Sequence, residues 1–122
     1  FLTCFISDPI GVELRHHIGI DNIAWECDYP HSDSSWPDAP EELAAVTVDV
    51  PDAEVDKISW QNASRWFSFD PFVHRTREQS TVAALRAEAA GHDVSIHSFD
   101  TGRIERSGKG ADLARIAAAV TA

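Results

Sequence analysis

The stretch IAWECDYPHSDSSWP, residues 23–37, sets a charged and aromatic loop directly behind a short apolar run. Ile23 to Trp25 have the character of a buried strand, and acidic residues begin immediately afterwards. Pro30 lies two positions beyond Asp28 and favours an extended or turning chain there, so no helix is expected to start at this point. A carboxylate at the tip of a buried strand therefore needs an explanation.

The residues before this stretch predict a strand and a helix that lead into it. FLTCFI, residues 1–6, is a continuous apolar run typical of a strand buried on both faces. Asp8 can cap a helix and Pro9 suits its first position, while Gly19 is placed to end it. Apolar residues recur every four positions and predict one inward helix face: Ile10, Leu14 and Ile18. Strand, helix and strand together predict a parallel βαβ unit.

Helices are expected in the region that follows the loop. Asp38 and Glu41 form a D-x-x-E capping pattern, which predicts a helix that opens near residue 39. TVDVP, residues 47–51, breaks that helix. A second helix is expected over 52–60, and Asn62 is expected to cap a further turn. Two apolar residues should face inward from the second helix: Val55 and Ile58.

The last fifty residues carry a pattern of their own. Thr76 and Gln79 form a second capping box, which opens a helix that Gly91 ends. Alternation over 93–99 predicts a strand, and the alanine-rich run 111–122 predicts a closing helix. The sequence therefore predicts two domains: residues 1–72, and a helix-strand-helix extension over 73–122.

Charge supports this division and excludes some functions. The 122-residue chain has a formal net charge of −10, which argues against nucleic acid as a partner. Residues 1–72 hold 14 acidic and 3 basic side chains, whereas residues 73–122 hold 6 and 7. No apolar run approaches the roughly 20 residues that span a bilayer, so no membrane is expected. Cys4 and Cys27 fall in or beside apolar runs and predict buried thiols in the cytoplasm.

Asp28 is the candidate functional residue on position alone. In parallel α/β folds, chemistry gathers at the carboxyl ends of the strands. Asp8 also follows a strand, but its capping role explains it. A carboxylate at position 28 is placed to hold a hard or borderline metal, or to accept a proton from a water that the metal activates. The alternative is an Asx turn, in which the aspartate binds its own backbone.

Three strings together resemble the C-terminal part of the amidohydrolase-related metal-dependent hydrolases. They are FISDP at 5–9, IGIDNIAWECDYPHSDSSWP at 18–37 and KISWQNASRWFSFD at 57–70. The eighth strand of that family ends in W-x-x-D-[YF]-P-H, and its closing helix carries N-A-x-R-[LW]-[FY]. The matching residues here are Trp25, Asp28, Tyr29, Pro30 and His31 for the first string, and Asn62, Ala63, Arg65, Trp66 and Phe67 for the second.

The resemblance implies a fold, a metal and site residues. The family is a (β/α)8 barrel that includes hydrolases and aromatic-acid decarboxylases, and it uses a divalent metal, here zinc or else manganese. By this resemblance Asp28 ligates the metal, helps deprotonate the attacking water, or does both. His31 and Trp36, in the loop behind it, are expected to contact a small-molecule substrate. Strand alternation places Glu26 on the same face as Asp28.

The resemblance also exposes a deficit. The family's other metal ligands are an H-x-H pair and single histidines on earlier strands, and no two of the six histidines here have that spacing. Two strands cannot close an eight-stranded barrel. The chain also opens at Phe1 within a strand pattern and has no methionine. We therefore expect the tail of a longer polypeptide, inactive by itself and without a bound metal.

The interpretation of the sequence is accordingly an α/β chain: the last two strands and helices of a TIM-like (β/α)8 barrel, with a C-terminal α/β extension. Its function would be metal-activated hydrolysis or decarboxylation of a small organic substrate. The alternative is a non-catalytic α/β module for interaction or oligomerisation. Because strands with uncovered edges pair with other chains, a homo-oligomer is expected in either case.

Overall fold

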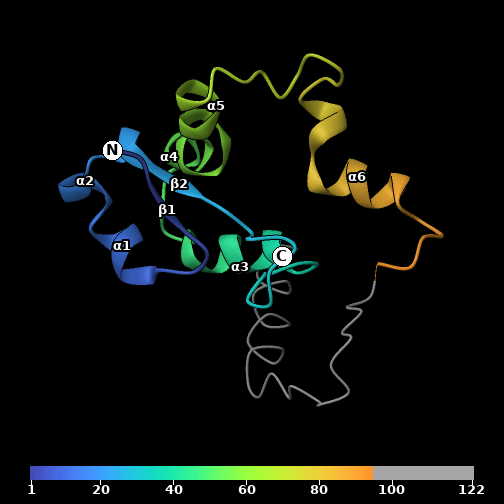
Figure 1. The fold of residues 1–122 in the computed structure, drawn as a ribbon, viewed down its shortest axis with the longest axis horizontal. Coiled ribbons are helices and arrows are strands. Elements are labelled where there is room, and N and C mark those ends of the chain that lie inside the picture. Colours follow the sequence, from blue (N-terminus) through green and yellow to red (C-terminus); the bar gives the residue numbers. More distant parts are fainter. Residues whose placement is uncertain (95–122) are drawn as a thin grey trace.

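A parallel pair of short strands lies at the centre of the fold (Figure 1). The computed structural model describes residues 1–94. Strand β1 (Thr3–Phe5) pairs in parallel with β2 (Ile23–Trp25), and Cys4 lies opposite Ala24 in the register. The chain runs through helices between the two strands, so the predicted parallel βαβ unit is confirmed.

The first strand is shorter and more exposed than its sequence predicts. Only three of the six apolar residues pair, and Thr3 and Cys4 are exposed. The expectation of burial on both faces is therefore wrong for β1. So is the prediction of a buried thiol at Cys4, whereas Cys27 is half-buried. The reason is that, among the described residues, β1 has a neighbouring strand on one edge only.

The helix after β1 begins as the sequence predicts and is interrupted at Leu14. The Asp8 carboxylate accepts a hydrogen bond from the Gly11 amide at 2.9 Å, so Asp8 is a helix cap. Two short helices follow, α1 (Pro9–Glu13) and α2 (Arg15–Ile18). Gly19 ends them with a φ of 100°, a conformation that glycine adopts without strain. A 3₁₀ turn, η1 (Ile20–Asn22), leads into β2.

The apolar face predicted for this helix is on the wrong side. Ile10, Leu14 and Ile18 are all exposed, and Val12 is the buried residue of α1. The predicted period assumed one continuous helix, but the backbone leaves helical geometry at Leu14. Because the helix is broken there, spacing of four residues no longer keeps side chains on one inward face.

Four further helical segments cover the strand pair. They are α3 (Ala39–Val46), α4 (Asp52–Asp56), a π-helical turn η2 (Lys57–Gln61) and α5 (Asn62–Trp66), of which the last three form one continuous run. The helix predicted near residue 39 and the break at 47–51 are confirmed. Two capping predictions are wrong: Asp38 makes no side-chain cap, and Asn62 lies inside the helix, buried.

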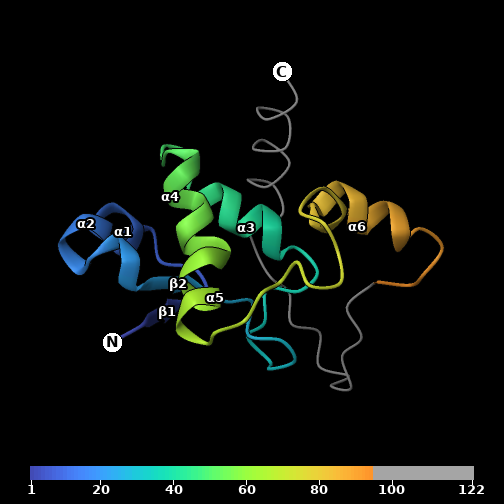
Figure 2. The ribbon, with the colours of Figure 1, turned by 90° about the horizontal axis from the view of Figure 1, so that it is seen from above.

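Helices flank the strand pair, with α1 and α3 below it and α4 and α5 above it in Figure 1, and Figure 2 shows α5 level with the strands. Ile23 and Ala24 point to opposite faces of β2, and each is only 2% exposed, so both faces of this strand are covered. Ile58, on the π-helical turn, is completely buried. The other buried apolar residues are Val12, Ile23, Ala24, Ala39 and Leu43.

Residues 67–94 lead away from α5 toward α6 (Figure 1). They contain a 3₁₀ turn, η3 (Glu78–Ser80), and helix α6 (Val82–Glu88). The predicted capping box forms, because the Thr76 amide donates to Gln79 Oε1 at 2.9 Å and the Gln79 amide donates to Thr76 Oγ1 at 3.4 Å. It encloses η3, however, and Thr81 is the cap of α6.

This segment docks onto α3 and α4 through ionic and aromatic contacts. Arg77 pairs with Asp56 at 2.6 Å and lies 5.6 Å from the ring centroid of Trp60. The ring of Phe72 meets Trp60 edge-on at 5.0 Å. A further pair at 2.5 Å joins α6 to the first turn of α3: Arg86 and Glu41.

Some sequence predictions fall beyond the described part of the chain. The helix predicted over 111–122 lies outside the described residues, and so does the strand predicted over 93–99, apart from residues 93 and 94, which are not in a strand. The domain division after residue 72 stays a prediction. None of the helices described over residues 1–94 combines the length and hydrophobicity of a bilayer-spanning segment.

Replacement of Ile58 tests whether this side chain lies in the core of the fold. Ile58→Ala removes a completely buried side chain and should lower the free energy of unfolding by about 2–5 kcal/mol, measured by urea denaturation. Val48→Ala, at an exposed position, should change it by less than about 0.5 kcal/mol. Similar losses for both variants would contradict this location of the core.

Candidate functional site

Asp28 lies three residues beyond the end of β2, at the carboxyl end of the parallel pair. Its backbone has a φ of 53°, a left-handed conformation in which aspartate is enriched among non-glycine residues. Its carbonyl accepts a hydrogen bond from the His31 amide at 2.9 Å, which closes a turn. The side chain is 23% exposed and so is partly shielded from water. The turn holds the carboxylate at the strand tip.

His31 reaches back to this carboxylate. The distance from His31 Nδ1 to Asp28 Oδ1 is 2.7 Å, and the imidazole itself is largely exposed. The hydrogen bond to Asp28 and its negative charge raise the pKa of His31, and the charges of Asp33 and Glu26 add to this effect. The protonated imidazole is therefore favoured in this loop.

Asp33 completes a three-residue group that the sequence analysis missed. Asp28, His31 and Asp33 each offer one ligand atom, and these atoms lie within 4.8 Å of one another. This is the one such group of metal-capable side chains among residues 1–94. The signal in the sequence was the D-x-x-H-x-D spacing within a turn-forming loop, which brings the three side chains to one side of the turn.

Two serines, also missed, hold the loop against the strand end. The carbonyl of Cys27 accepts hydrogen bonds from Ser34 Oγ at 2.8 Å and from the Ser35 amide at 3.1 Å. The Ser34 hydroxyl also accepts from the Trp36 amide at 3.2 Å. Ser35 is 2% exposed, and its hydroxyl has no hydrogen-bond partner among the described residues. The peptide group between Cys27 and Asp28 is thus held in place by these two hydrogen bonds to its carbonyl.

Trp36 lies on the rim of the loop. Its ring meets that of Tyr29 edge-on, with centroids 6.0 Å apart, and both side chains are exposed. Glu26, the other acid of this strand end, donates its amide to the Phe5 carbonyl at 3.0 Å and is exposed. The structure therefore gathers Asp28, His31 and Asp33, and sets Trp36 beside them as a rim residue.

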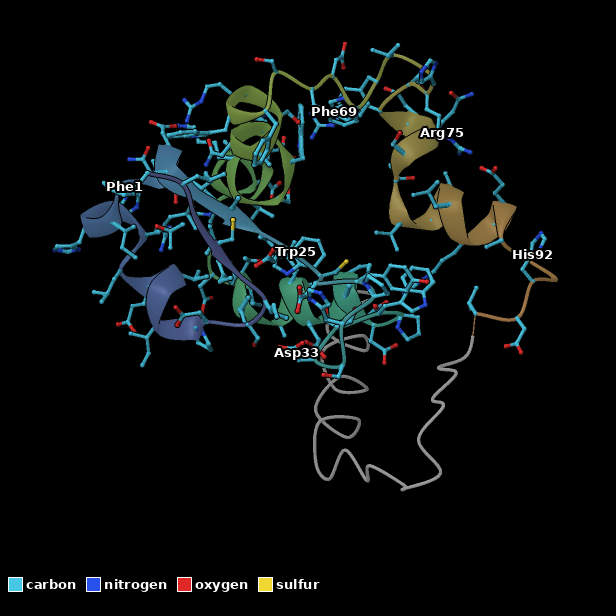
Figure 3. The ribbon with its side chains drawn as sticks, viewed as in Figure 1. Phe1, Trp25, Asp33, Phe69, Arg75 and His92 are labelled. Carbon is cyan, nitrogen blue, oxygen red and sulfur yellow. The ribbon has the colours of Figure 1, made fainter. Side chains whose placement is uncertain are left out.

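The strand end itself is tied to β1 by a side chain of the same motif. The indole nitrogen of Trp25 donates to the Ile6 carbonyl at 3.2 Å, just beyond the end of β1. Figure 3 shows Trp25 near the strands, while Arg75 lies far from it, on the segment that leads to α6. The other paired histidine among the described residues is His16, whose Nε2 lies 3.5 Å from Glu54 Oε1 on α4. Arg15 pairs with the same carboxylate, so both side chains join α2 to α4.

These observations define a class of protein. A parallel βαβ unit with an acid–histidine group at the carboxyl end of its second strand has the layout of an α/β enzyme site. The amidohydrolase family model matches residues 1–69, more than half of the chain, and the chain belongs to that family. A comparison with curated proteins finds no match. The family resemblance carried by the two motifs is thus confirmed.

The pKa of His31 tests the contact with Asp28. In the metal-free chain, NMR titration should give His31 a pKa above its usual value, because the neighbouring carboxylate favours the protonated ring. The contact should be strongest below the ordinary histidine pKa, and it should weaken as the pH rises through the raised value.

Two substitutions separate the effect of the Asp28–His31 contact on the pKa of His31 from that of the overall negative charge of the chain. Asp28→Asn should return the pKa of His31 toward about 6.5, the value of an unperturbed histidine. Asp49→Asn removes an equal charge from an exposed position in the turn after α3 and should leave the pKa of His31 in place. A His31 pKa that does not respond to Asp28→Asn would contradict the pairing.

Proposed function

We propose that this chain contributes the last two strands of an amidohydrolase-type (β/α)8 barrel and that Asp28 acts in a metal-dependent reaction at the barrel mouth. The observation that carries the proposal is the group Asp28, His31 and Asp33 at the carboxyl end of β2. In a parallel barrel this end is the catalytic face. Membership of the amidohydrolase family supports a hydrolase-type activity.

The strand pair supports the barrel. Two adjacent parallel strands, joined through helices, are the repeating unit of a (β/α)8 barrel. In this proposal the carboxyl ends of β1 and β2 lie at the barrel mouth, and six further strands come from polypeptide beyond the residues described here.

The donor atoms suit a divalent cation. Two carboxylates and one imidazole are oxygen and nitrogen ligands of the kind that zinc and manganese accept. Of the three side chains, that of Asp28 is mostly buried, and His31 and Asp33 are exposed. We propose Asp28 as the principal protein ligand in this chain, with zinc as the first choice of metal and manganese as the second.

Each residue of the loop has a proposed role. When bound, a divalent cation supplies a Lewis acid that polarises a substrate carbonyl or carboxyl and makes water more acidic. Asp28 holds the cation or accepts a proton from the attacking water. A protonated imidazole cannot bind a cation, so His31 has one of two proposed roles: as a neutral ring it is a third ligand, and as a protonated ring it donates a hydrogen bond to an anionic part of the substrate. Trp36, in the same loop, is proposed to contact the substrate. The reaction is hydrolysis or decarboxylation of a small organic molecule.

A manganese titration followed by electron paramagnetic resonance tests this proposal on the 122-residue chain. The sequence predicts no metal bound to this chain by itself; with the three-residue group we instead expect weak binding, because one short loop supplies all three donors and two of them are exposed. Asp28→Asn should weaken binding at least tenfold, since it removes the most shielded carboxylate. Asp49→Asn is the matched control and should bind as the wild type does. Equal affinities of all three proteins, or no binding by the wild type, would contradict the proposal.

Self-association is a second candidate function, favoured by the open strand edges. Each described strand has one partner, so one edge of β1 and one edge of β2 offer unpaired backbone groups. We propose that, as a non-catalytic module, the chain forms a homo-oligomer through these edges. In the complete barrel the same edges would be paired with neighbouring strands, so this interface belongs to the second candidate function alone.

Analytical ultracentrifugation distinguishes the edge from other surfaces. Thr3→Lys places a charge on β1 and should shift the wild-type oligomer toward monomer, because charged edge strands resist pairing. Val48→Lys places the same charge at an exposed site outside the strands and should leave the mass unchanged. An oligomer that survives Thr3→Lys would show that the edge of β1 is not the interface.

A further inference from the structure

A single buried amide joins helix α5 to the start of β2. Asn62 is 2% exposed, and its Nδ2 atom donates to the carbonyls of Ile20 and Ile23, both at 2.8 Å. These carbonyls lie three residues apart, on either side of the entry into β2. Both amide hydrogens are therefore used to fix one short piece of backbone.

Neighbouring side chains strengthen the same attachment. Arg65, one helical turn later, donates to the Asp21 carbonyl and lies 3.5 Å from Asn62 Oδ1. Lys57 pairs with the Asp21 carboxylate at 2.8 Å. The π-helical turn η2, which begins at Lys57 and ends just before Asn62, shifts the helical phase by about one residue. As a result, Lys57 at its start and Asn62 just after it both contact the η1 turn. The motif N-A-x-R thus acts on the backbone that precedes β2.

The register of β2 depends on this attachment. Its ladder with β1 spans three residues, and it has no other strand partner among the described residues. A slip of one residue would turn every side chain of the strand to the opposite face. Asp28 lies three residues beyond the end of β2, so its place at the carboxyl end of the strand pair depends on the register of that strand.

We propose that Asn62 is a positioning residue for Asp28: its two hydrogen bonds set the register of β2 and thereby place the carboxylate at the carboxyl end of the strand pair. The two motifs, 34 residues apart, would then be parts of one device, with Trp25 and Asp28 on the strand and Asn62 and Arg65 on the helix. The relevance to catalysis rests on the proposed role of Asp28, whereas the effect on the strand does not.

Hydrogen exchange at the strand end tests the proposal on the 122-residue chain. Asn62→Leu keeps the number and branching of the side-chain heavy atoms and removes both donors. Thr47→Val is the matched control, because Thr47 is buried and its hydroxyl donates to the Leu43 carbonyl at 2.8 Å, within α3. The two reporters are the Glu26 amide, bonded to Phe5, and the Ser35 amide, bonded to Cys27. Circular dichroism confirms that both variants are folded.

The proposal predicts exchange about tenfold faster at Glu26 and Ser35 in Asn62→Leu, relative to amides of α3 and to the same amides in Thr47→Val. Equal exchange at these amides in the two variants, or a uniform acceleration along the whole chain, would overturn it. Manganese affinity is the second readout: Asn62→Leu should weaken binding, and Thr47→Val should not. If the wild type binds no manganese but exchange differs as stated, the proposed metal role fails and the positioning of β2 stands.

Discussion

A parallel ladder of three residues per strand is too short to hold itself in register, and the rest of the fold is arranged around that constraint. Two-stranded sheets have little independent stability in water. Here side chains add what the ladder lacks. Asn62 fixes the start of β2, and Trp25 joins its end to the end of β1. The loop serines then fasten the Cys27 carbonyl, so that the strand is held along its whole length.

The candidate site is a consequence of how this strand ends. The chain turns at Asp28 with a left-handed residue and comes back past His31 and Asp33 before the serines return it to the strand. A tight loop of this kind brings three side chains that could hold a metal together without any long-range contact. Its charges favour the protonated form of His31 in the metal-free chain, and a cation has to displace that proton to bind the imidazole. The site is therefore local, while its placement depends on the sheet.

Local chemistry explains which parts of the fold could be predicted. The βαβ order, the Asp8 cap, the stop at Gly19 and the reciprocal box of Thr76 and Gln79 all depend on neighbouring residues, and the sequence shows them. The inward face of the first helix could not be predicted, because a break at Leu14 changes the phase. Asp28 was found from its strand-end position and the family motif.

Contacts over long separations account for what the sequence did not show. The role of Asn62 required knowledge that residues 20 and 62 meet, and its sequence context suggested a cap instead. Asp33 and the two serines are an exception, because their contacts are local, but the composition of this polar loop does not show which way its side chains point. Membership of the amidohydrolase family, by contrast, is visible in the two motifs, because each keeps its own spacing.

The central claim is that the strand-end loop of this chain holds the cation. The most direct measurement is anomalous X-ray diffraction from crystals of the chain grown with zinc. The account predicts an anomalous peak about 2.0–2.2 Å from a carboxylate oxygen of Asp28. A peak only at other groups, such as His16 and Glu54, with none at residues 28–33, would contradict it.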